Sequence, residues 1–267
     1  MSVWVLTAEG GSGGGGFNSP GPSSFEYPPL FGSGTFFTKP MLIIVLMSLT
    51  VAILFYLAAR RAATVPGKTQ FAGESAYGFV RTGIALETIG KEGMRFVPYL
   101  ATLFFFIAAL NITGIIPMLQ FPPTSRIAIP LFLAVISWAI YNFLGIRRAG
   151  FVGYFKAMMF PPGIPWPVYI LLAPIELFST FLVRPITLCL RLTFNMFAGH
   201  LVLLLFILGG EYLVFHKGGP VGVVAGSVSL LGSLVLTFFE GFVQILQAYV
   251  FTLLTALYIG GALVDEH

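Results

Sequence analysis

The chain has 267 residues, of which 57% are hydrophobic and 9% are charged, and its mean hydropathy is +0.93. Soluble domains carry about 25% charged residues, so this composition excludes a water-soluble domain and requires lipid as the solvent. The net charge of +4 comes without a run of Lys and Arg, which excludes a typical nucleic-acid-binding surface. The single cysteine, Cys189, excludes an internal disulfide and a multi-cysteine metal site, and we expect no metal and no cofactor.

Residues 1–38 form a segment rich in Gly and Pro, with no charged start and too few apolar residues for a signal peptide. The glycine run at 10–16 has the composition of a phosphate-binding loop, but no strand precedes it and no helical pattern follows it. We therefore predict a flexible N-terminal tail on the extracytoplasmic side, followed by a single membrane-embedded helical domain over 39–267.

Five apolar segments after this tail are long enough to cross a bilayer, which takes about 20 residues in a helix. They cover 41–59, 97–119, 127–146, 168–208 and 221–264. The last segment would measure roughly 60 Å as a helix, about twice the hydrocarbon thickness, so it must tilt steeply or break near Gly226 or Gly232. We predict an all-α integral membrane protein with about five transmembrane helices, of which the last two form a long tilted hairpin.

The distribution of Lys and Arg predicts the orientation of these helices. Six such residues lie between the first and second segments and three follow the third, whereas three lie on the opposite side. The positive-inside rule places the nine in the cytoplasm, together with the C-terminus, and the N-terminal tail outside. Segment 71–97 mixes charged residues with Phe79, Ile84, Leu86 and Ile89, which predicts an interfacial amphipathic helix on the cytoplasmic surface.

Seven polar residues stand inside the predicted membrane segments, where a charged side chain costs about 2.5–3.5 kcal/mol and usually has a function. They are Glu176, Arg191, Asn195, His200, Glu240, Gln244 and Gln247. A histidine and a carboxylate can exchange protons, whereas an arginine stays charged and cannot relay them. We interpret the set as a fixed cation with titratable groups behind it, rather than as polar groups that only join one helix to another.

The helical repeat assigns the residues around the arginine to faces. Asn195 lies one turn beyond Arg191 on the same face, whereas His200, nine residues beyond Arg191, lies on the opposite face. Arg184 stands near the end of a span, where it either extends to the lipid headgroups or has a functional role.

The last two helices can bring their polar residues together. Glu240 and Gln247 share one stripe of the final helix because seven residues make about two turns. An antiparallel register that pairs Arg191 with Gln247 brings His200 and Glu240 to within about a turn of the same depth, since the two rises are roughly 13.5 and 10.5 Å.

Several segments together resemble the subunit a family of bacterial rotary (F-type) ATP synthases. The stretch "LRLTFNMFAGHL" (190–201) is similar to the family's arginine helix, and "QAYVFTLLTALYI" (247–259), followed by the acidic end "DEH", is similar to its C-terminal helix. Between the N-terminal tail and these stretches, three blocks follow in the family's order: "NITGIIP" (111–117), "GIRRAG" (145–150) and "PIELFSTFLVRP" (174–185). The resemblance covers most of residues 25–267.

The resemblance implies a role for each polar residue. Arg191 corresponds to the essential cation that faces carboxylates on a rotating ring, with Gln247 beside it. The half-channel open to the outside is implied to contain Asn195, His200 and Glu240, and Gln244 is expected to line a half-channel. Glu176 falls near the acidic position of the half-channel open to the cytoplasm, one residue further from the arginine than in the commoner spacing. Gly114 stands where some members have an aspartate.

The resemblance further implies a non-catalytic subunit that acts as the stator proton channel. Its two offset half-channels would pass protons to and from the carboxylates of the c-ring and so couple proton flow to ring rotation and ATP synthesis. The implied partners are the proteolipid c-ring, b-type peripheral stalk subunits, the remainder of the ATP synthase and membrane lipid, with no nucleic acid. The implied location is the cell membrane of a bacterium.

Three other functions remain open at this point. A stand-alone ion-coupled secondary transporter would use intramembrane charges to bind its substrate, but such folds usually carry internal repeats, which this sequence lacks. An intramembrane hydrolase would need a metal-binding His-Glu-x-x-His motif, which does not occur, or a Gly-x-Ser-x-Gly elbow between a strand and a helix. The one such pattern, at 10–14, lies in the glycine run of the tail, where no strand precedes it. A non-conducting assembly scaffold would not need the combination of Arg, His and Glu inside the membrane.

Overall fold

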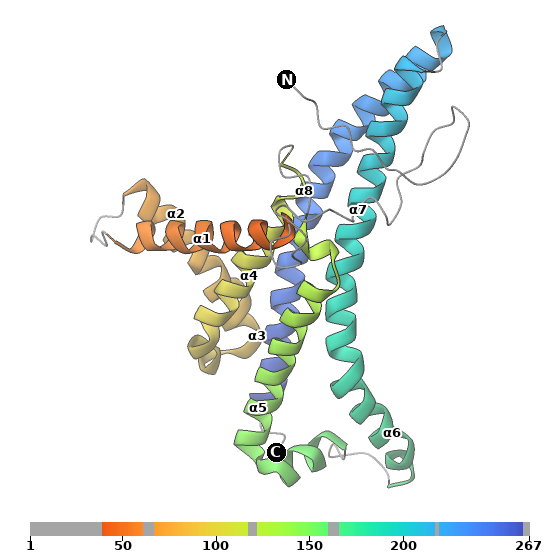
Figure 1. Ribbon diagram of the computed structural model, residues 1–267. Helices are drawn as coiled ribbons and strands as arrows, with labels where there is room; N and C mark the ends of the chain where they lie inside the picture. The colour runs from red at the N-terminus through yellow and green to blue at the C-terminus, as the bar shows by residue number, and fades with distance from the viewer. Residues whose placement is uncertain (1–38, 61–66, 117–121, 160–165, 217–218, 264–267) are drawn as a thin grey trace, which may run out of the picture.

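The computed structural model describes residues 39–60, 67–116, 122–159, 166–216 and 219–263, and every regular element within these ranges is a helix (Figure 1). The expected N-terminal tail and the acidic C-terminal end lie outside the described residues.

The described ranges contain five helices long and apolar enough to cross a membrane, which confirms the predicted number and the all-α membrane fold. Four of the principal helices are α1 (Lys39–Ala59), α4 (Val97–Ile112), α5 (Ala128–Met159) and α8 (Pro220–Leu263). Between α5 and α8, helix α6 (Trp166–Phe178) continues through a π-helical turn, Ser179–Val183, into α7 (Arg184–Phe215).

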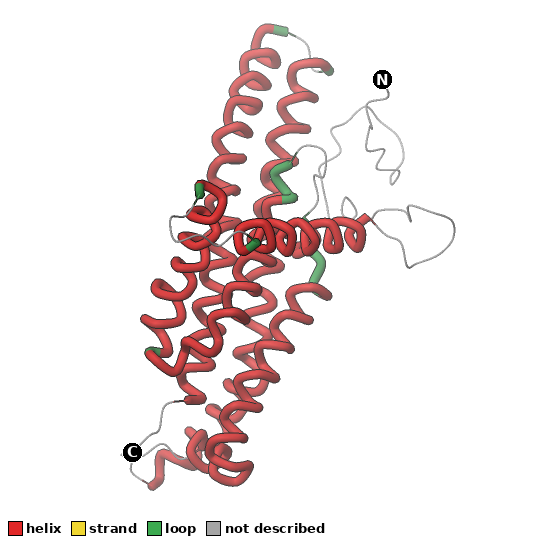
Figure 2. Tube along the Cα trace, turned by 90° about the vertical axis from the view of Figure 1, so that its left-hand side faces the viewer, coloured by secondary structure: helices red, strands yellow, loops and turns green. Residues whose placement is uncertain are grey.

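Helices α7 and α8 form the long hairpin that the sequence predicts. Helix α8 runs for 44 residues without interruption, so the alternative of a break near Gly226 or Gly232 is wrong. At 1.5 Å per residue it is about 66 Å long, more than twice the thickness of the hydrocarbon layer, and it must therefore tilt steeply. Both views show α7 and α8 side by side and α1 crossing their direction (Figures 1 and 2).

Two glycines let the backbones of the hairpin approach each other near its tip. A Cβ atom added at Gly226 would lie 2.8 Å from the Gly210 carbonyl oxygen, and one added at Gly210 would lie 3.2 Å from the Gly226 oxygen. Close by, the Ser229 hydroxyl donates to the Phe206 carbonyl oxygen at 2.9 Å. Small residues allow the tight backbone contact on which helix association in lipid depends.

The expected interfacial segment is helical in pieces. It consists of α2 (Lys68–Val80), a π-helical turn (Arg81–Leu86), α3 (Glu87–Ile89) and a 3₁₀ helix (Lys91–Phe96). Gly90, at φ 80°, separates the last two pieces. Phe79 and Leu86 are exposed as an interfacial helix requires, but Val80, Ile84 and Ala85 are buried in the core. The segment therefore packs on the bundle through one face.

Helix α5 extends beyond the predicted end of its span at 146. It continues through Arg147 and Arg148 to Met159, with a sharp change of direction at Gly150, whose φ of 73° favours glycine. After this bend the Tyr154 hydroxyl donates to Asn142 Oδ1 at 2.9 Å, which ties the last turns back to the body of α5.

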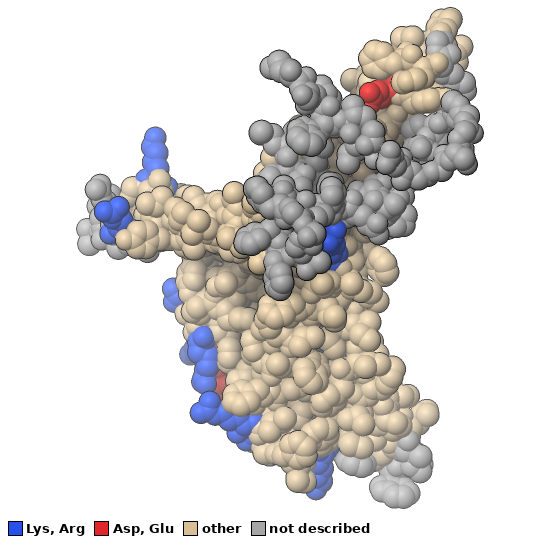
Figure 3. Space-filling view, viewed as in Figure 1, with Lys and Arg blue, Asp and Glu red and all other residues tan. Residues whose placement is uncertain are grey.

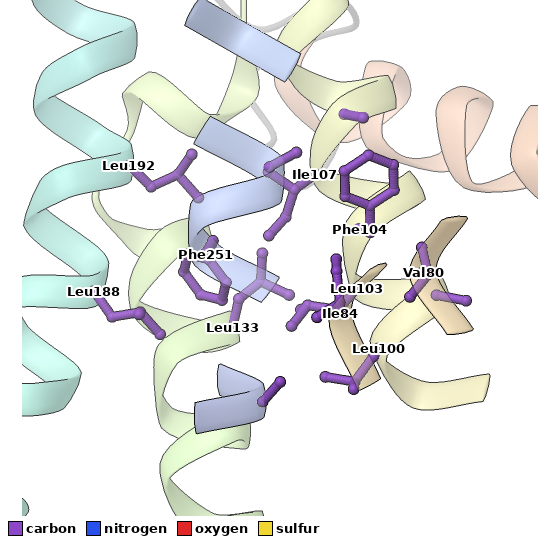
Figure 4. Packing of buried hydrophobic residues seen from close by; sticks show 14 of the residues in the cluster. Val80, Ile84, Leu100, Leu103, Phe104, Ile107, Leu133, Leu188, Leu192 and Phe251 are labelled. Carbon is purple, nitrogen blue, oxygen red and sulfur yellow. The ribbon is translucent and has the colours of Figure 1, made fainter. Parts of the chain in front are cut away.

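The apolar core lies between α4, α5, α7, α8 and the turn that follows α2. Figure 4 shows Phe251 of α8 among Leu188 and Leu192 of α7 and Leu133 of α5, with Ile107 of α4 close by. All five are buried. This packing fixes the rotation of α7 and α8, and it thereby determines which of their residues face away from the bundle.

Charged residues are distributed unevenly over the surface. On the face shown in Figure 3, most Lys and Arg side chains gather along the left and lower edges, where Figure 1 places α2, the lower end of α4 and the end of α5.

We predict that Gly226→Ala destabilises the hairpin by about 1–3 kcal/mol, because the added methyl group meets the Gly210 carbonyl and overpacks the contact. Gly261→Ala, on the same helix with no atom within 4 Å of the added Cβ, is the matched control and should be neutral or slightly stabilising. The midpoints of thermal unfolding of the two purified variants in detergent measure the difference. Equal midpoints would contradict the close contact.

Candidate functional site

Arg191 lies on an exposed face of α7. Leu188, Leu192 and Met196 recur every four residues and are all buried, so they form the stripe that faces the core. Arg191 is one residue before Leu192, which turns it about 100° away from this stripe, and it is exposed. Among the described residues it takes part in no ion pair and no hydrogen bond. It is a permanent charge on the outer surface of a membrane helix.

An amide pair joins the arginine face to α8. Asn195 Nδ2 donates to Gln247 Oε1 at 2.7 Å, between an exposed asparagine and a buried glutamine. The expected register paired Gln247 with Arg191, whereas the hydrogen bond lies one turn further along α7. The other amide atom of Gln247, Nε2, has no partner among the described residues, so this pair leaves a buried donor available.

Glu240 and His200 lie at the same level of the hairpin, as the predicted register requires. Both are buried, and Glu240 is only 6% exposed. A Cβ atom added at Gly199 would lie 3.5 Å from Glu240 Oε1, so the carboxylate packs directly on the residue that precedes the histidine. His200 is buried and Arg191 is exposed, which confirms that they occupy different faces of α7.

A buried polar chain continues from Glu240 into the neighbouring helices. Gln244 Nε2 donates to Glu240 Oε1 at 3.4 Å, and the backbone oxygen of Gln244 accepts from Asn111 Nδ2 at 3.2 Å. Asn111 Oδ1 in turn accepts from the Thr124 hydroxyl at 2.7 Å. Gly114 adjoins this chain, because an added Cβ would lie 3.2 Å from Gln244 Nε2.

Asn111 and Thr124 were not identified as site residues from the sequence. Asn111 is a fully buried amide near the end of an apolar helix, and a polar residue in an apolar segment indicates a functional position. Thr124 lies in the short 3₁₀ turn Pro123–Ser125 between α4 and α5, and only the tertiary structure brings it to Asn111. Glu240 Oε2 and Gln244 Oε1 are buried without a partner among the described residues. The buried polar chain therefore retains two free hydrogen-bond acceptors.

A second polar group lies where α6 continues into α7. Arg184 Nη2 and Glu176 Oε1 form an ion pair at 3.3 Å, with side chains that are 33% and 37% exposed, respectively. The Arg184 guanidinium also lies over the Tyr258 ring of α8, 5.3 Å from its centroid. Arg184 is therefore held by a carboxylate and an aromatic ring, which favours a specific role over simple extension to the headgroups.

Arg191 lies between the two polar groups along α7. Arg184 precedes it by seven residues, or about 10.5 Å, and Gly199, which contacts Glu240, follows it by eight residues, or about 12 Å. The arrangement provides titratable carboxylates on both sides of a cation that cannot lose its proton. Within the described ranges, no three His, Cys, Asp or Glu side chains come together as metal ligands.

Comparison with known proteins gives consistent matches over nearly the whole chain. A family model described as ATP synthase A chain matches residues 41–260. The chain is 47% identical over 277 residues to ATP synthase subunit a of a Nocardioides species, covering 98% of each chain. It is 45% identical to the protein of the same name from Streptomyces lividans, covering 94% of this chain and 90% of the relative. The match to Rhodococcus erythropolis is 45% over 272 residues, covering 100% and 96%.

Proposed function

This chain belongs to the ATP synthase A chain family, and on that premise we propose that it is the stator proton channel of a bacterial ATP synthase membrane sector. The observation that carries the proposal is the position of Arg191, exposed on α7 between two separate polar groups. A single continuous channel would not need a permanent cation in its middle. Two half-channels that must not exchange protons directly require such a barrier.

The polar chain around Glu240 is the half-channel open to the outside. A proton enters past His200 and Glu240, whose positions at one level of the hairpin allow them to act together, and Gln244 extends the polar lining toward α4. The proton then neutralises a carboxylate on the rotating c-ring. A neutral carboxyl group enters lipid at a much lower free-energy cost than a carboxylate, so the ring can turn.

Glu176 and Arg184 begin the half-channel open to the cytoplasm. A ring carboxyl that approaches Arg191 loses its proton, because a nearby cation stabilises the carboxylate. The proton leaves past Glu176, the acidic residue on this side of Arg191. The membrane voltage contributes about 2.3 kcal/mol per proton per 100 mV and sets the direction of flow. No covalent chemistry takes place in this chain.

The partners and the orientation follow from this function. The exposed face of α7 that carries Arg191 meets the c-ring, and b-type stalk subunits hold the chain against rotation. The nine Lys and Arg residues of the predicted cytoplasmic segments face the cytoplasm, with the N-terminus outside and the C-terminus inside. A secondary transporter, the alternative, would purify without a ring of small proteolipid subunits, so co-purification of such a ring separates the two functions.

We predict that Arg191→Ala abolishes coupled ATP synthesis while passive proton leak through the membrane sector persists or increases, because the barrier between the half-channels is lost. Arg191→Lys should also fail, since a lysine can lose its proton when it is buried against the ring. Arg147→Ala, which removes an exposed arginine of α5 just beyond its predicted span, is the matched control and should synthesise ATP normally. Normal synthesis by the Arg191→Ala enzyme would refute the proposed function.

A second prediction concerns His200 and Glu240. Either single substitution, His200→Ala or Glu240→Ala, should slow proton entry by at least about tenfold without loss of assembly, because the titrating pair loses one member. The exchange His200→Glu with Glu240→His keeps one group of each kind at the same level and should restore part of the rate. Proton flux and co-purified ring are measured in all three. If the proton flux of the exchanged variant is no higher than the two single losses added together predict, the residues do not act as a pair.

A further inference from the structure

The π-helical turn Ser179–Val183 lies between Glu176 and Arg184, and Pro185 explains why it forms. Arg184 N–H donates to the Ser179 carbonyl, five residues earlier, instead of to Thr180, four residues earlier. The next residue, Pro185, has no N–H with which to serve the Thr180 carbonyl, and its ring displaces the carbonyl four residues before it. The wider turn therefore leaves Thr180 oxygen without an amide donor from its own helix.

Tyr141 of α5 supplies the missing donor. Its hydroxyl donates to the Thr180 carbonyl oxygen at 2.8 Å, and both residues are buried. A buried carbonyl without a partner would cost about 1–3 kcal/mol. With the tyrosine hydroxyl as its donor, the Thr180 oxygen is satisfied while the Arg184 amide bonds to Ser179, so the wide turn leaves no buried carbonyl unpaired.

The wide turn determines whether Glu176 can reach Arg184. Eight residues of regular α-helix turn through about 800°, which would leave the two side chains about 80° apart. A π-helical turn takes up one additional residue, so the same eight residues rotate as about seven do and bring both side chains onto one face. The observed ion pair at 3.3 Å agrees with this geometry.

Rings of α5 hold the turn from the side. Phe181, within the turn, lies 5.8 Å from the Trp138 ring and is stacked on the Phe155 ring at 5.5 Å. Tyr141 also packs against Tyr258, at 5.6 Å between ring centroids, on the ring that the Arg184 guanidinium covers. One tyrosine thus contacts both the backbone of the turn and the aromatic support of its arginine.

We propose that Tyr141 is a positioning residue for proton release to the cytoplasm: its hydroxyl keeps the turn Ser179–Val183 wide and so holds Glu176 on the face of Arg184. The role rests on the proposed function, because it acts through Glu176. Without the hydroxyl, the Arg184 amide can return to Thr180 oxygen, four residues before it, and the turn becomes α-helical. Glu176 then rotates away from Arg184 and from the exit path.

The test is a double-substitution cycle in the complete ATP synthase, with ATP-driven proton pumping measured in inverted membrane vesicles. Tyr141→Phe keeps the ring and removes only the hydroxyl, and it should lower the pumping rate about three- to tenfold. In a Glu176→Gln background the same change should lower the rate by less than about twofold, because a positioning residue has no effect once the group it positions is gone. The amount of chain that co-purifies with the ring reports assembly.

Tyr99→Phe is the matched control. Its hydroxyl also bonds across to α5, at 2.9 Å from Ser137 Oγ, rather than to the backbone of the turn. It should pump at the parental rate. If Tyr141→Phe pumps normally, or loses the same factor with and without Glu176, the positioning role is wrong. A Glu176→Gln enzyme that pumps normally, together with an inactive Arg191→Ala enzyme, would overturn this inference and leave the stator function intact. ATP synthesis by Arg191→Ala would overturn both.

Discussion

The structure depends on keeping one permanent charge at the surface of an apolar helix. A guanidinium cannot be neutralised by losing a proton, and in lipid it is costly wherever it has no partner. The buried stripe of Leu188, Leu192 and Met196 fixes the rotation of α7, so Arg191 has no route into the core. The exposed cation then needs an external anion, and under the proposed function that anion is a carboxylate of the ring.

The two arginines of α7 illustrate opposite solutions to the same problem. Arg184 is satisfied within the chain, by Glu176 on one side and by the Tyr258 ring on the other. Arg191 has no ion pair or hydrogen bond in the part of the chain that the structure describes. A satisfied arginine can orient a proton path, whereas an unsatisfied one can exchange partners as a rotor passes. Both arginines and Glu240 lie on the packed hairpin of α7 and α8, which separates them along its length.

Much of this architecture could be predicted from the sequence. Hydropathy gave the five helices, and the helical repeat separated Arg191 from His200 and brought His200 level with Glu240. Spacing along single helices does not determine how α7 and α8 are aligned with each other. The predicted register was therefore one turn off: it paired Gln247 with Arg191, whereas Gln247 bonds to Asn195.

Two irregular backbone elements were not predicted from the sequence. The bend at Gly150 follows from a positive φ, and the π-helical turn follows from a proline together with a tyrosine on another helix. That turn takes up one additional residue between Glu176 and Arg184.

The most direct test of the central claim is a cross-link between the arginine face and the ring. In a chain with Cys189→Ser, a cysteine replaces either Phe194, which is 59% exposed, or Met196, which is 1% exposed at nearly the same level of α7. The ring subunit carries a cysteine one turn from its carboxylate. Oxidation of the assembled complex should join the ring to position 194 and not to position 196. Cross-linking at 196 with none at 194 would mean that the face of Arg191 does not meet the rotor.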